Sequence, residues 1–190
     1  MKALEQRILS EGTVLNGDIL KVGSFLNQQL DVDFLLEMGN EVKNLYDGQE
    51  ITKILTIEAS GIAIAVAIAA VMHKKVVFAK KNKSANVSGE VYSANVHSYT
   101  RNVDYLISVP KDYLNDKDKV LIVDDFLASG KALEGLVDII NQAGATIVGC
   151  TCAIEKGYQG GGDKLRKAGY KVQSLAVIDK MSSDGIEFRQ

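Results

Sequence analysis

The chain has 190 residues, of which 46% are hydrophobic and 24% charged, a balance that allows one sizeable core and argues against disorder. The net charge of -2 does not favour the basic face or arm that nucleic-acid binding proteins usually carry. The most apolar run, residues 62–72, is too short to span a bilayer, and residues 1–12 lack the apolar core of a secretory signal. We therefore predict a cytoplasmic protein that binds neither membranes nor nucleic acids.

The N-terminal quarter of the chain shows helical spacing of apolar residues. Leu4 and Ile8 lie one helical turn apart and predict a short helix that ends at Gly12. A second helical pattern covers residues 31–48, and residues 13–30 between the two have no clear periodicity.

Downstream of residue 50, short apolar strands alternate with helical segments. The predicted strands are residues 53–57, 76–79, 105–109, 120–123, 147–154 and 171–178, and the predicted helices are residues 62–73, 133–144 and 163–168. Near-continuous apolar strands are typical of a sheet that is covered on both faces. The sequence thus predicts an α/β fold, with a mostly parallel sheet flanked by helices.

Two stretches depart from this alternation. Residues 80–102 are polar with weak alternation, and we expect a flexible hairpin loop inserted between sheet strands, because loops of this length are usually functional or mobile. Residues 13–30 precede the sheet, and we expect them to form a small hood together with the tail, residues 156–190. We treat residues 1–190 as a single domain.

The strongest motif is residues 120–132, VLIVDDFLASGKA. Asp124 and Asp125 follow a buried strand, and a turn of small residues leads into an amphipathic helix. Ligands of open α/β sheets bind beyond the carboxyl ends of the strands, and a small-residue turn lets backbone N–H groups and a helix N-terminus approach a phosphate. The carboxylates suit a ribose diol or a divalent ion, so the motif predicts a sugar-phosphate site. The alternative is an ordinary strand–turn–helix unit with solvent-exposed aspartates.

Two weaker elements accompany this motif. Residues 58–62, Glu-Ala-Ser-Gly-Ile, again form a small-residue turn between a strand and a helix, although such a turn is often only a turn. Residues 80–83 open the polar insertion with a lysine cluster, which alone is more typical of a solvated surface. Cys150 and Cys152 lie in an apolar run, and we interpret them as small buried hydrophobic residues rather than metal ligands. We expect no metal site formed by the protein alone.

The thirteen residues of the strongest motif resemble the 5-phosphoribosyl-1-pyrophosphate (PRPP) signature of the type I phosphoribosyltransferase family. The resemblance implies that residues 128–132 hold the 5′-phosphate and that Asp124 and Asp125 act on the ribose. These phosphate-loop residues are Ala128, Ser129, Gly130, Lys131 and Ala132. Lys131 departs from the family pattern, because many members carry glycine or another polar residue at this position.

The same resemblance gives a role to the two weaker elements. It implies a pyrophosphate and magnesium loop at Glu58, Ser60 and Gly61, with Lys81 at the base of a mobile hairpin that closes over the leaving group. The Mg²⁺ is expected to sit mainly on PRPP and pyrophosphate oxygens, as is usual for this ion.

The resemblance covers nearly the whole chain and is greatest for the bacterial xanthine phosphoribosyltransferases. It implies that Leu20, Asn27 and Lys156 contact the purine, with the Lys156 ammonium facing O6. Adenine-specific members carry Glu-Tyr-Gly at the end of the hairpin, whereas residues 98–100 here are Ser-Tyr-Thr. We therefore expect transfer of the phosphoribosyl group from PRPP to N9 of xanthine, giving xanthosine 5′-monophosphate, by an enzyme that the family pattern predicts to be a homodimer.

Two other classes of function remain open. One is an adenine or a guanine/hypoxanthine phosphoribosyltransferase. The other is a non-catalytic PRPP-sensing regulator of the same fold, although the residues before the first sheet strand lack a basic recognition helix.

Overall fold

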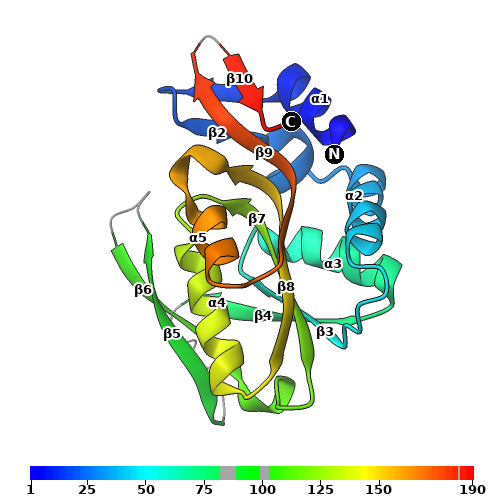
Figure 1. Ribbon diagram of the computed structural model, residues 1–190, viewed down its shortest axis with the longest axis vertical. Helices are drawn as coiled ribbons and strands as arrows, with labels where there is room; N and C mark the ends of the chain where they lie inside the picture. Colours follow the sequence, from blue (N-terminus) through cyan, green and yellow to red (C-terminus); the bar gives the residue numbers. More distant parts are fainter. Residues whose placement is uncertain (82–88, 99–102, 184) are drawn as a thin grey trace.

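The computed structural model describes residues 1–81, 89–98, 103–183 and 185–190 (Figure 1). The helices are α1 (Lys2–Glu11), α2 (Val32–Leu45), α3 (Gly61–Met72), α4 (Lys131–Gln142) and α5 (Gly161–Lys167). The strands are β1 (Thr13–Leu15), β2 (Ile19–Lys21), β3 (Lys53–Ile57), β4 (Lys75–Lys81), β5 (Val91–Ser98), β6 (Val103–Pro110), β7 (Lys119–Leu127), β8 (Thr146–Lys156), β9 (Val172–Ser182) and β10 (Gly185–Phe188). Single helical turns are η1 (Gly23–Asn27), η2 (Lys111–Tyr113) and η3 (Gly157–Gln159).

The main sheet has the strand order β10-β9-β8-β7-β3-β4-β6-β5. The five central strands, β9 to β4, run parallel, whereas β10 on one side and β6 and β5 on the other are antiparallel to their neighbours. This arrangement confirms the predicted α/β class. Because parallel strands end at the same edge, the segments that follow β3, β7 and β8 meet there.

A hydrophobic core lies on each face of the sheet. Ile54 and Leu121 belong to the core that α1, α2 and α3 cover, and Leu55 and Ile122 belong to the core beneath α4 and α5. Adjacent strand residues point to opposite faces, so continuous apolar strands supply both cores at once. Figure 1 shows α2 and α3 on one side of the sheet and α4 and α5 on the other.

The N-terminal segment is more regular than the sequence predicts. Residues 13–30 contain the antiparallel β1–β2 hairpin and the turn η1. Asn16 and Gly17 form the hairpin turn, with φ angles of 51° and 74°. Asparagine and glycine tolerate this left-handed region, and Asn-Gly is the usual signal for such a turn. In Figure 1 this hairpin, α1 and β10 gather near both chain ends.

Part of residues 80–102, predicted as a flexible hairpin loop, lies in strands of the sheet. β4 extends to Lys81, and residues 91–98 form β5, which pairs with β6 along its whole length. Asn82 and Lys83 of the lysine cluster, together with Tyr99 and Thr100, lie outside the described residues. Strand β10 was also not predicted. Within the described part of the chain, every helix is too short or too polar to cross a membrane.

Candidate functional site

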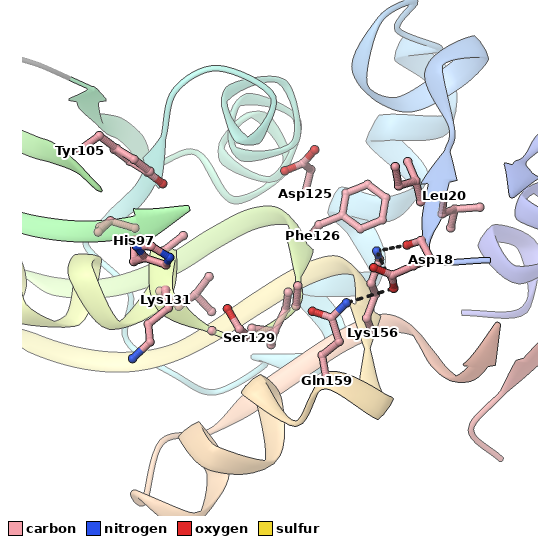
Figure 2. A pocket seen from close by; sticks show the side chains of 17 residues that line it. Asp18, Leu20, His97, Tyr105, Asp125, Phe126, Ser129, Lys131, Lys156 and Gln159 are labelled. Atoms are coloured by element: carbon pink, nitrogen blue, oxygen red, sulfur yellow. Dashed lines mark hydrogen bonds and ion pairs between the residues drawn. The ribbon is translucent and has the colours of Figure 1, made fainter. Parts of the chain in front are cut away.

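A cavity of about 600 Å³ opens at the carboxyl ends of the central strands (Figure 2). Most of the predicted ligand-binding residues line it: Leu20, Asp125, Ala128, Ser129, Gly130, Lys131, Ala132 and Lys156. In Figure 2, Lys131 lies toward one end of the cavity, Leu20 and Lys156 lie at the other, and Ser129 and Asp125 lie between them. The structure thus brings the predicted phosphate loop and two of the three predicted base-binding residues, Leu20 and Lys156, into one cavity.

The phosphate loop connects β7 to α4 and is backed closely by a second loop. Gly130 adopts a φ of 85° immediately before α4, and the Gly161 amide donates to the Ala128 carbonyl at 3.1 Å. A Cβ atom on Gly161 would lie 2.5 Å from the Gly130 nitrogen, so only glycine fits there. This tight turn at the N-terminus of a helix of 12 residues suits a phosphate group.

Lys131 is the first residue of α4 and has an acidic neighbour one turn later. Its ammonium lies 3.0 Å from a carboxylate oxygen of Glu134, and Lys164 contacts the other oxygen at 2.5 Å. Burial alone would raise the pKa of Glu134, but the hydrogen bonds from Lys164 and Lys131 lower it below its ordinary value. Lys131 therefore belongs to an ion-pair network at the rim of the cavity.

Asp124 and Asp125 lie inside strand β7 rather than after it, which corrects the predicted strand end at residue 123. Both side chains are buried, so the alternative of solvent-exposed aspartates is wrong. Asp125 lines the cavity and accepts a hydrogen bond of 3.3 Å from the Asn27 amide. Burial, together with the charge of Asp125, raises the pKa of Asp124 well above its ordinary value, and nearby Lys81 opposes this only in part.

The predicted pyrophosphate loop lies between β3 and α3. Ser60 is the N-cap residue of α3, Gly61 is its first residue, and the Glu58–Ala59 peptide bond is cis. A Cβ atom on Gly61 would lie 3.0 Å from Asp124 Oδ1 and would press on the Thr56 hydroxyl, so the loop approaches the aspartate pair closely.

Glu58 and Lys81 come together, as the resemblance implies. A carboxylate oxygen of Glu58 accepts from the backbone amide of Lys81. The Lys81 ammonium lies 5.2 Å from the ring centroid of Tyr105, which lines the cavity. The predicted pyrophosphate loop and the start of the polar insertion at Lys81 therefore flank the same site.

At the base end, Leu20 is buried on β2 and Lys156 ends β8, where its side chain is only 13% exposed. The Lys156 ammonium donates to the backbone carbonyl of Asp18. Asn27 belongs to η1 and reaches the site through its hydrogen bond to Asp125.

Several cavity residues were not predicted, namely Asp18, His97, Tyr105, Phe126 and Gln159. The Asn16-Gly17 turn signal could have identified the hairpin that carries Asp18. Phe126 lies inside the motif of residues 120–132 but was interpreted only as part of it. His97, Tyr105 and Gln159 carry no local motif, because elements far apart in the sequence bring them to the cavity.

The predicted burial of the two cysteines is confirmed. Cys150 and Cys152 are free thiols in the core beneath α4, and burial raises the pKa of Cys150 to about 12. Among the described residues there is no group of three or more His, Cys, Asp or Glu side chains that could hold a metal ion.

Comparison with known proteins places the chain in a family. The model of the phosphoribosyl transferase domain matches residues 30–184. Xanthine phosphoribosyltransferase 2 of Clostridium botulinum is 50% identical over 190 residues, with full coverage of both chains. Xanthine phosphoribosyltransferase of Bifidobacterium adolescentis is also 50% identical, over 192 residues and with full coverage of both.

Solved structures show the same fold at low identity. Adenine phosphoribosyltransferase from Saccharomyces cerevisiae has a TM-score of 0.74 at 18% identity, covering 92% of this chain and 99% of that one. The enzyme from Rhodothermus marinus has a TM-score of 0.73 at 21% identity, covering 93% and 98%. With a domain match over most of its length and full-length relatives at half identity, this chain belongs to the phosphoribosyl transferase family.

Proposed function

We propose that this chain is a xanthine phosphoribosyltransferase, a pentosyltransferase of purine salvage. It transfers the 5-phosphoribosyl group from PRPP to N9 of xanthine and forms xanthosine 5′-monophosphate and pyrophosphate. The observation that carries the proposal is the single cavity that joins the phosphate loop, Asp125 and Lys156 (Figure 2). The relatives at half identity are named for xanthine, which favours this base over adenine.

Residues 128–132 bind the 5′-phosphate in this proposal, and Asp124 and Asp125 orient the ribose. The bond between C1′ and the pyrophosphate oxygen breaks, a bond between C1′ and N9 forms, and the N9 proton of the base is lost. The ribosyl carbon gains positive charge in the transition state, so the work of the protein is positioning and electrostatic stabilisation. The buried carboxyl pair and the closely backed loop supply such a preorganised site.

Glu58, Ser60, Gly61 and Lys81 bind the pyrophosphate end. The donors available near this loop are carboxylate oxygens, and Mg²⁺ prefers oxygen ligands, usually one or two carboxylates together with substrate phosphates and water. When bound, Mg²⁺ neutralises part of the charge of the leaving group. The Lys81 ammonium, beside Tyr105, adds a positive charge on the same side.

Leu20, Asn27 and Lys156 select the base. Leu20 covers a ring face, Asn27 can donate and accept along the N3/O2 edge, and the Lys156 ammonium binds O6. An ammonium also favours the anionic form of xanthine, which loses a proton more easily than other purines. The Lys156 side chain is only 13% exposed, which strengthens this preference, because water screens its charge less.

We also propose that residues 13–30 and 156–190 form a hood over the base, and that the protein acts in the cytoplasm, where buried free thiols stay reduced.

A homodimer is supported by exposed apolar side chains on α2 and α3, with Val32 62%, Leu36 36% and Val66 52% exposed. Light scattering coupled to size exclusion tests the dimer, and a monomer at micromolar concentration would contradict it.

The assay that tests the function supplies PRPP, Mg²⁺ and each purine in turn and follows pyrophosphate release. We expect turnover with xanthine and weaker turnover with guanine or hypoxanthine. Turnover with adenine alone would overturn the choice of base, and no turnover with any base would overturn the enzyme assignment.

A charge-matched pair of variants tests the base-binding role of Lys156. Lys156→Ala should raise the KM for xanthine far more than the KM for PRPP. Lys167→Ala removes an exposed lysine of α5 and should change neither value. Equal increases in both KM values for Lys156→Ala would contradict the assigned role.

A further inference from the structure

The tip of the β1–β2 hairpin is fastened to the end of β8 through one residue, Asp18. The Lys156 ammonium donates to the Asp18 carbonyl and lies 3.8 Å from the Asp18 carboxylate. The same carboxylate oxygen accepts from the Tyr158 hydroxyl at 2.8 Å and from the Gln159 amide at 3.3 Å. Figure 2 shows Asp18 between Leu20 and Lys156 at the base end of the cavity.

These contacts restrain the Lys156 side chain from the β1–β2 hairpin, which is not part of the main sheet. A lysine side chain has four rotatable bonds, and its ammonium is directed only where a partner holds it. The Asp18 carbonyl provides that partner, and the carboxylate of the same residue is held in turn by Tyr158 and Gln159. Leu20 follows Asp18 by two residues on β2, so the same contacts also fix the position of Leu20 over the cavity.

The exposure of Asp18 argues against a role in core stability. Its side chain is 63% exposed, and exposed ion pairs contribute little to the free energy of unfolding. Yet its carboxylate and carbonyl together take contacts from Lys156, Tyr158 and Gln159. These contacts lie on an exposed residue beside a cavity. We therefore interpret them as orienting Lys156 and the β1–β2 hairpin rather than as stabilising the fold.

We propose that Asp18 is a positioning residue for base binding, which fixes the Lys156 ammonium and holds the β1–β2 hairpin over the base end of the cavity. The proposal rests on the proposed function and deepens it, because it explains how a flexible lysine selects an oxopurine. Asp18 strengthens binding of the base without contacting it, because the Lys156 ammonium is already held in place before the base binds.

Steady-state kinetics with four variants test the proposal. Asp18→Ala keeps the backbone carbonyl but removes the carboxylate that Tyr158 and Gln159 hold, so the carbonyl should no longer be fixed beside Lys156. It should raise the KM for xanthine about tenfold or more, the loss expected for hydrogen bonds to a charged group, and leave the KM for PRPP within about twofold. Asp18→Asn keeps an oxygen that accepts from Tyr158 and Gln159, and should recover most of the wild-type KM. Tyr158→Phe should fall between the two. Asp47→Ala, an exposed aspartate in the turn after α2, is the matched control and should resemble the wild type.

Amide hydrogen exchange gives a second readout that does not depend on turnover. Asp18→Ala should accelerate exchange across residues 13–21 of the ligand-free protein, and Asp47→Ala should not. An unchanged xanthine KM, equal rises in both KM values, an asparagine variant as impaired as the alanine variant, or unchanged exchange would each overturn the proposal. If the wild type turns over no purine, the proposed function fails, and the exchange result still decides whether Asp18 holds the hairpin.

Discussion

Removing the arginine that pairs with the buried Glu155 carboxylate should cost the protein a large part of its stability. The Glu155 side chain is 1% exposed and accepts from Arg166 Nη1 at 2.8 Å and from Nη2 at 2.7 Å. The Ser174 hydroxyl donates to it at 2.5 Å. The bond to Glu155 raises the pKa of Arg166 even though its partial burial opposes this. Arg166→Met would leave a buried carboxylate with one hydroxyl donor.

The expected loss is about 3–5 kcal/mol in the free energy of unfolding, the usual result of leaving one buried charge without its partner. For a chain of this size that corresponds to a fall in Tm of roughly 6–20 °C, at about 2–4 °C per kcal/mol. Urea and thermal denaturation followed by circular dichroism at neutral pH measure both quantities. The double variant Glu155→Gln with Arg166→Met should recover most of the loss, because it removes the buried charge as well.

Arg189→Met is the matched control for this experiment. Arg189 also forms a close pair, with Asp179 at 2.7 Å. The two arginines are similarly exposed, at 32% for Arg166 and 37% for Arg189, but Asp179 is 43% exposed whereas Glu155 is 1% exposed. Removal of Arg189 should cost at most about 1 kcal/mol. Arg166→Met should lower the free energy of unfolding more than Arg189→Met does. If it does not, or if the double variant is as unstable as Arg166→Met alone, burial of Glu155 does not determine the strength of its ion pair.

Three further predictions concern the candidate site. Gly61→Ala should lower kcat/KM for PRPP by about 100-fold or more in initial-rate assays, because its Cβ would lie 3.0 Å from Asp124 Oδ1, and displacements of this kind are costly in active sites. Burial raises the pKa of Asp124 in the folded chain. The contribution of this carboxyl group to the free energy of unfolding is therefore full below its unfolded pKa of about 3.9, and it is lost as the pH rises through its folded pKa. In the Asp124→Asn variant, stability should therefore decrease less steeply with rising pH than in the wild type. Urea denaturation of the ligand-free protein from about pH 5 to 8 measures this dependence. An equally steep decrease in the variant would contradict the buried-charge explanation. Lys131→Ala should raise the KM for PRPP less than about threefold, since Lys131 is paired with Glu134; a rise above tenfold would indicate a direct phosphate contact.

The sequence predicted the parallel sheet well because its strands are continuous apolar runs. β3 was predicted with its observed bounds, Lys53–Ile57, since every residue from Ile54 to Ile57 is buried and turn residues follow. β7 was predicted too short, because Asp124 and Asp125 are polar, yet Asp124 still pairs with Cys152 of β8. A carboxylate inside a buried strand has no local sequence signal that separates it from a strand end.

The base end of the site was harder to predict. β1 and β2 have three residues each, too few for a recognisable alternation, and only the turn between them carries a signal. The contact between Asp18 and Lys156 joins residues 138 positions apart. Such a pair follows from the way the hairpin packs on the sheet, and no spacing in the sequence encodes it. The resemblance to a family identified Lys156, but the residue that holds Lys156 needed the structure.

The adjacent acids of the motif, Asp124 and Asp125, have different neighbours in the structure. Asp125 lines the cavity and accepts a hydrogen bond from Asn27. Asp124 lies close to the start of α3, where a Cβ atom on Gly61 would be 3.0 Å from its Oδ1. If β7 had ended before them, both carboxylates would be solvated and neither orientation would be fixed. The extension of β7 through Leu127 thus holds both carboxylates inside the sheet, one beside the cavity and one beside the start of α3.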